Sequence, residues 1–155
     1  MWNDIYLSVF VRAWLAGLFG FLIGWERVMV GSPVRARMVA LAALNAAAIT
    51  AISMEMFQAD TGRILAGLVT GIGFLGAGVI MRVPTGEVSG LTTAASIWAM
   101  SAVGITVGSG NILLGLMLTV LVYVTISWND WPVLNRLLQR QAQKQTQDAE
   151  SRPPL

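Results

Sequence analysis

The chain has 155 residues, of which 55% are hydrophobic and only 12% are charged, and its mean hydropathy is +0.68. A soluble domain normally carries about 25% charged residues, so this composition favours a protein embedded in a membrane. It has no cysteine and no histidine, which excludes disulfides, thiol chemistry and imidazole catalysis. A net charge of +2 is too small to indicate a partner nucleic acid.

Long gaps between charged residues predict five membrane-spanning helices, because each gap is about one bilayer long. In chain order these spans are expected at residues 5–24, 38–56, 64–81, 91–108 and 112–128. We therefore expect an all-α integral membrane protein whose bundle of five transmembrane helices forms one domain over residues 1–131. The polar sequence from 132 to 155 is expected to be a cytoplasmic tail that is partly disordered.

Arg12 is the charged residue within the first predicted span. It lies about seven residues from the start of that span, which corresponds to roughly 10 Å at 1.5 Å per residue. A charge at such a depth costs about 2.5–3.5 kcal/mol, so Arg12 is a candidate functional residue. Its expected partner is Glu55, Asp60 or a polar side chain of the third or fourth span. Alternatively, the side chain extends outward to the membrane surface.

The basic residues between the spans predict the orientation of the chain in the membrane. With five spans, eight Lys and Arg residues fall on one side and Arg63 alone falls on the other. This bias places the N-terminus outside and the C-terminus in the cytoplasm. Three short clusters of charged residues on the cytoplasmic side either form an ion-pair network or only fix the topology. They are Glu26 with Arg27, Arg35 with Arg37, and Arg82 with Glu87 around the turn Pro84-Thr-Gly86.

Asp60 and Arg63 lie before and at the start of the third predicted span, on the outer side. They are either functional residues at the mouth of the bundle or an ordinary arrangement of a carboxylate near a helix N-terminus.

Glycines are concentrated in the third span, where they match the pattern G-x-G-x-x-G. A dinucleotide site would also need a preceding strand and a following acidic residue, and here the glycines lie within an uncharged run long enough to cross a bilayer. Small residues in such a helix let neighbouring backbones approach closely. The glycines expected to pack helices together are Gly67, Gly71, Gly73, Gly76, Gly78, Gly104 and Gly108, with Gly17, Gly20 and Gly24 in the first span.

Several hydroxyl and amide side chains within the spans are expected to form hydrogen bonds between helices, mainly as structural contacts. They are Asn45, Thr92, Thr93, Ser96 and Ser101. Nothing in the sequence has the spacing of a metal cluster or of a nucleophile with its base, so we expect no enzyme activity, no cofactor and no bound metal.

Three ordered segments resemble the MgtC/SapB family over roughly residues 8 to 128. They are Leu22-Ile-Gly-Trp-Glu-Arg27, Arg63-Ile64 followed by Gly71-Ile-Gly-Phe-Leu-Gly-Ala-Gly-Val-Ile80, and Gly90-Leu-Thr-Thr-Ala-Ala-Ser-Ile-Trp98. The resemblance implies a multispan bacterial inner-membrane protein that supports growth in low magnesium and survival inside macrophages. It also implies a short form without the soluble C-terminal domain of many members. The residues to test by this match are Arg12, Glu26, Arg27, Arg35, Asp60, Arg63, Thr92 and Thr93.

The segment Pro33-Val-Arg-Ala-Arg37 departs from the family's usual inner loop, so only Arg35 carries over there. Two functions remain open. The first, which the resemblance favours, is a regulator that docks against another membrane complex, such as the F-type ATP synthase. The second is a transporter or small channel for Mg²⁺ or another ion, although no carboxylate lies at mid-depth in a predicted span. A homo-oligomer is also open, since a dimer assembled across the glycine faces could create an ion pathway that one chain cannot.

Overall fold

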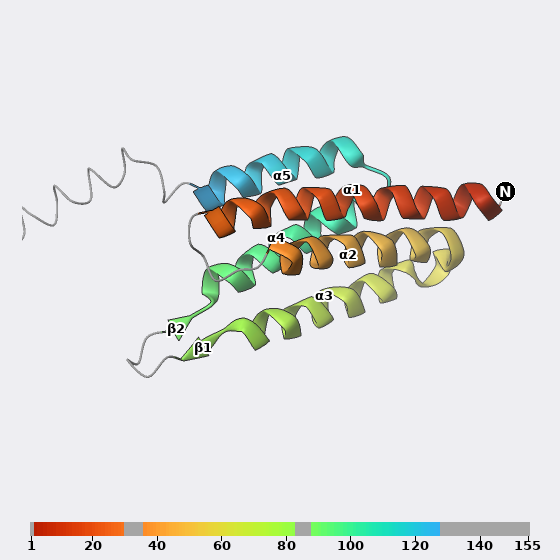
Figure 1. Ribbon diagram of the computed structural model, residues 1–155. Helices are drawn as coiled ribbons and strands as arrows, with labels where there is room; N and C mark the ends of the chain where they lie inside the picture. The colour runs from red at the N-terminus through yellow and green to blue at the C-terminus, as the bar shows by residue number, and fades with distance from the viewer. Residues whose placement is uncertain (1, 30–35, 83–87, 128–155) are drawn as a thin grey trace, which may run out of the picture. The chain divides into compact units, whose positions relative to one another are not determined.

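The computed structural model describes residues 2–29, 36–82 and 88–127. The chain divides into two compact units, Met1–Val122 and Tyr123–Leu155. Of the second unit, the structure describes only the helical residues Tyr123–Ser127. The elements, all but η1 labelled in Figure 1, are α1 (Trp2–Met29), α2 (Ala36–Met56), the 3₁₀-helix η1 (Gln58–Asp60), α3 (Thr61–Val79), β1 (Met81–Arg82), β2 (Val88–Ser89), α4 (Leu91–Gly108) and α5 (Ile112–Ser127).

The helices confirm the predicted all-α membrane architecture. In the described part of the chain, four segments are long and apolar enough to cross a bilayer: Asn3–Glu26, Ala36–Met56, Gln58–Val79 and Leu91–Gly108. Helix α5 is also apolar but has 16 residues, which is about 24 Å of helix. The first helix has 28 residues and extends beyond the predicted span at both ends. Large apolar side chains such as Phe74, Leu113 and Phe10 are at least 66% exposed, as expected for surfaces that contact lipid chains.

Helix α2 is at the centre of the first unit and packs on α1 through small residues. A Cβ atom added at Gly20 would lie 2.8 Å from the Cα of Ala40, and one at Gly24 would lie 2.5 Å from the Cα of Ala36. The two backbones are therefore in direct contact, which increases dispersion attraction where lipid provides no hydrophobic driving force. Glycines of the first span thus have the packing role predicted for them.

The contact of α2 with α4 uses the same principle. A Cβ at Gly104 would collide with the carbonyl oxygen of Ala43, and one at Gly108 would lie 2.5 Å from the carbonyl oxygen of Ala47. Ala43 and Ala47 are completely buried. The alanines of α2 are the partners of both glycine pairs, and they were not among the residues predicted to pack the helices. Their four-residue spacing was the available signal.

A short hairpin that was not predicted from the sequence joins α3 to α4. Strand β1 pairs with β2 in antiparallel register, with Met81 opposite Ser89 and Arg82 opposite Val88. Gly90 follows with φ of 92°, and a Cβ there would collide with the carbonyl oxygen of Val79 at the end of α3. Glycine is therefore needed to close the hairpin against α3 and begin α4.

Helix α3 packs least tightly of the four long helices, with only Ile72 and Gly76 buried. A Cβ at Gly76 would be 3.7 Å from the Cβ of Ala94, an ordinary contact with α4. A Cβ atom added at any of the other predicted packing glycines of this helix would meet nothing within 4 Å. They are Gly67, Gly71, Gly73 and Gly78. Among the residues that the structure describes, these four glycines do not hold helices together, and their role in association remains a prediction.

Candidate functional site

The position of Arg12 is set by the pairing of α1 with α2. These helices are antiparallel, with Gly24 beside Ala36 and Gly20 beside Ala40. The same register places Arg12 level with the C-terminal half of α2, about eight residues or 12 Å before the end of that helix at Met56. The helix begins at Trp2, so a full ten residues precede Arg12. Arg12 is therefore well inside the bundle, and about a quarter of its side chain is exposed.

The turn between α4 and α5 lies at this same depth. Gly108, the last residue of α4, packs against Ala47 and Thr50, so the turn is about 11 Å from the C-terminal end of α2. The amide N–H groups of Ser109, Gly110 and Asn111 donate to carbonyl groups of the preceding helical turn. A turn that satisfies its own amides can lie at such a depth without a large desolvation cost.

Arg12 satisfies the carbonyl group at the end of α4. Its Nη1 atom donates a hydrogen bond to the carbonyl oxygen of Gly108 at 3.2 Å. Carbonyl groups in the last turn of a helix have no partner in that helix, and the negative end of the helix dipole favours a cation there. Gly110 has φ of 91°, and a Cβ at this residue would lie 3.8 Å from the guanidinium carbon of Arg12.

Glu55 balances the charge of Arg12. The Nη1 atom of Arg12 lies 3.4 Å from Oε1 of Glu55, and the two side chains are 24% and 31% exposed. Side chains on a helix point toward its N-terminus, so Arg12 extends toward the start of α1 and Glu55 toward the start of α2, and the two side chains meet. Of the partners considered from the sequence, Glu55 is the one observed. We call Arg12, Glu55 and the carbonyl of Gly108 the Arg12 cluster; it joins α1, α2 and α4.

Asp60 and Arg63 do not belong to the Arg12 cluster. They form an ion pair of 3.5 Å, three residues apart, and both side chains are more than half exposed. Asp60 is the residue before α3 but makes no side-chain capping bond. Exposed pairs of this kind contribute at most about 1 kcal/mol. Thr61 instead ties α3 to α2, because its hydroxyl donates to the carbonyl of Ser53 at 3.0 Å.

The predicted residues on the inner side are only partly described. Glu26 is near the end of α1 with its Oε2 atom buried, and Arg37 is exposed in the first turn of α2. Thr92 is exposed and Thr93 half-buried at the start of α4. Arg35 and Glu87, together with the side chains of Arg27 and Arg82, are outside the described part of the structure, as is the tail from 132 to 155.

The buried hydroxyl groups do not form the predicted bonds between helices. Ser96 donates to the carbonyl of Thr92 and Ser101 to that of Ile97, each at 2.8 Å within α4. In α2, Thr50 donates in the same way to Ala46 at 2.7 Å. A hydroxyl can reach the carbonyl four residues earlier in its own helix, and this local bond competes with a bond to a neighbour.

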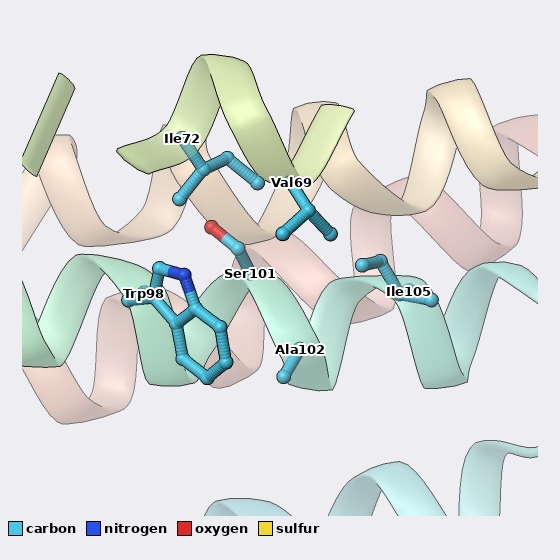
Figure 2. A pocket seen from close by; sticks show the side chains of 6 residues that line it. All are labelled: Val69, Ile72, Trp98, Ser101, Ala102 and Ile105. Atoms are coloured by element: carbon cyan, nitrogen blue, oxygen red, sulfur yellow. The ribbon is translucent and has the colours of Figure 1, made fainter. Parts of the chain in front are cut away.

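Two hollows flank α3. Between α3 and α4 is a small cavity of about 50 Å³, and Figure 2 shows Val69 and Ile72 of α3 facing Ser101 and Ile105 of α4 across it. Between α3 and α2 is a larger, open groove of about 530 Å³. In the described part of the chain, no three Asp, Glu, His or Cys residues gather as they would around a metal ion.

The comparisons with known proteins agree on one family. The model of the MgtC family matches residues 14–131 of this chain. Protein MgtC of Salmonella typhimurium is 42% identical over 107 residues, which cover 69% of this chain and 46% of that protein. Protein SrpB of Synechococcus elongatus is 35% identical over 137 residues, covering 79% of this chain and 75% of SrpB.

A protein of Haemophilus influenzae is 34% identical over 154 residues, which cover 93% of this chain and 64% of its own length. The chain thus spans about half to two thirds of the length of several curated relatives. No solved structure matches it.

Proposed function

Because the chain belongs to the MgtC family, whose model matches most of its length, we propose that it is a regulator that docks within the membrane against another membrane protein complex. By resemblance to the family, we place this role in adaptation to low magnesium and in survival inside macrophages, with the F-type ATP synthase as the first complex to test. That it is a multi-pass membrane protein follows from its family and its four long apolar helices.

The side of α3 that faces away from the other helices is the observation that carries this proposal. Ala66, Thr70, Gly73 and Ala77 follow one another at spacings of four, three and four residues, and all four are exposed. A Cβ at Gly73 would meet nothing within 4 Å. Such a face has little to gain from lipid chains, but it allows the backbone of another helix to approach closely. We call these four residues the lipid-facing side of α3.

Replacing Gly73 with Leu tests whether the lipid-facing side of α3 is the docking surface. The added side chain enters open space, so the monomer should fold normally, whereas a docked helix would be displaced. Both tagged chains are purified from native membranes after growth in low magnesium. We expect the amount of co-purifying complex to be at least ten-fold lower with Gly73→Leu than with the unaltered chain. Gly67→Leu is the matched control, since Gly67 also meets nothing within 4 Å but lines the groove on the other side of α3.

Transport of Mg²⁺ or another ion is the alternative function, and it predicts a different result. Purified protein in liposomes loaded with a Mg²⁺ indicator would then show ion flux, and Arg12→Ala would abolish that flux. If the chain is a regulator, we expect the ion flux to be no greater than that of liposomes without protein. Retention of the co-purifying complex by Gly73→Leu, together with flux, would replace the regulator proposal with transport.

We further propose that the chain lies in the bacterial inner membrane with its N-terminus outside and its C-terminus in the cytoplasm. The bias of Lys and Arg residues between the helices supports this orientation. A green fluorescent protein fused after Leu155 should fluoresce, and alkaline phosphatase fused at the same point should be inactive. An active phosphatase fusion would reverse the orientation.

A further inference from the structure

The groove between α2 and α3 has an unusual chemical composition. Its lining is apolar except for one amide, and it carries no charged side chain. Asn45 provides that amide from α2, beside Gly67 and Gly71 of α3. The groove has a volume of about 530 Å³ and is open to the surface rather than enclosed.

Asn45 lies near the middle of the membrane. It is nine residues from the start of α2 and eleven from its end, which places it about 14–16 Å from either end of the helix. Its side chain is exposed, and across residues 2–29, 36–82 and 88–127 it has no hydrogen-bond partner. An amide facing hydrocarbon loses the hydrogen bonds that water would provide, so a partner in the membrane is strongly favoured.

The glycines beside Asn45 leave space for such a partner. Cβ atoms at Gly67 and Gly71 would meet nothing within 4 Å, so no other part of the described chain fills the space in front of them. A helix entering the groove could therefore bring its backbone close to α3 while its side chains reach Asn45.

We propose that the occupant is a second copy of this chain, related by a two-fold axis along the membrane normal, with the two Asn45 amides hydrogen-bonded to each other. The complementarity is intrinsic, because an amide is both donor and acceptor and so pairs with an identical group. Copies inserted in the same orientation present the same residue at the same depth, as a two-fold interface requires. This inference goes beyond the proposed function and uses a different side of α3.

The first experiment measures dimerisation of the full chain in lipid, by single-molecule photobleaching in liposomes over a range of protein-to-lipid ratios. Asn45→Ala should raise the dimer dissociation constant about ten-fold, the loss expected for one hydrogen-bonded amide pair in a membrane. Asn45→Gln keeps the amide and should weaken the dimer less. Gly67→Leu should block the groove, while Gly73→Leu should leave the dimer intact.

The second experiment uses the absence of cysteine from the sequence. Asn45→Cys introduces a single thiol, and two copies paired at this residue should form a disulfide-linked dimer on mild oxidation. Met117→Cys is the control, because this exposed residue of α5 lies at a similar depth, six residues inward from the α4–α5 turn. It should cross-link at the rate of random collision.

An unchanged dissociation constant for Asn45→Ala, or equal cross-linking of the two cysteine variants, would overturn the proposal. So would a chain that is monomeric at every protein-to-lipid ratio, which would assign the groove to a different partner. The outcome is separable from that of the regulator proposal. Loss of the dimer in Gly67→Leu with retention of the co-purifying complex supports both, and loss of the complex alone in Gly73→Leu leaves the dimer standing.

Discussion

Replacing Gly104 with Leu should cause the largest loss of stability of any single change considered. Even one added carbon atom would collide with the carbonyl oxygen of Ala43, which belongs to rigid helical backbone. The side chain can be accommodated only if α4 separates from α2, and this breaks the contacts along both helices. We expect a cost of about 3 kcal/mol or more. Thermal unfolding of the purified protein in detergent, followed by circular dichroism or tryptophan fluorescence, measures it.

Gly78→Leu is the matched control for this experiment. Gly78 is also a helical glycine in an apolar segment, but a Cβ there meets nothing within 4 Å. Its replacement should leave the unfolding temperature nearly unchanged. Gly104→Ala should fall between the two. If Gly104→Leu and Gly78→Leu unfolded at the same temperature, close packing of α2 on α4 would not be a source of stability.

Replacing Glu55 with Leu should have the second-largest effect. Arg12 would then remain inside the bundle with the carbonyl of Gly108 as its only partner among the described residues, and its charge would be uncompensated. Removing one member of a buried pair costs about 3–5 kcal/mol. Because these side chains are about a quarter to a third exposed, we expect a smaller loss of about 2 kcal/mol. The same unfolding measurement tests this value.

A double-mutant cycle isolates the interaction of Arg12 with Glu55. Arg12→Leu with Glu55→Leu should recover part of the stability lost in Glu55→Leu, because no charge then remains buried. Recovery should be incomplete, since the carbonyl of Gly108 loses its donor. Exchanging the two residues should also fail to restore full stability, because Arg12→Glu places a carboxylate beside that carbonyl. Additive effects of the two single changes would show that the pair does not interact.

The helices could be predicted from the sequence because charges are excluded from them. Their partners could not. The most prominent glycines, in the third span, make few contacts within the chain, whereas Gly20 and Gly104 pack against alanines of α2. A small residue permits close approach equally to a helix of the same chain, to a partner or to lipid. The sequence therefore indicates where close approach is possible but not which helix makes it.

Arg12 illustrates the same limit for the candidate site. Its burial follows from its place within an apolar run, and a carboxylate partner was expected. The hydrogen bond to Gly108 could not be predicted, because it depends on where α4 ends relative to α1 and involves a backbone atom. The strands β1 and β2 were missed for a related reason. Each has two residues, too few to show an alternating pattern, although the turn between them was recognised.

The shallow α4–α5 turn has a consequence for the surrounding lipid. Helix α2 continues about 11 Å beyond the level of Gly108, so hydrocarbon in the leaflet around this turn is matched to a shorter apolar surface here than along α2. The mismatch must be relieved by local thinning of the leaflet or by tilt of the helices. Longer acyl chains would increase that strain next to Arg12 and Glu55. Bilayer thickness thus becomes a mechanical input to the contacts that join α1, α2 and α4.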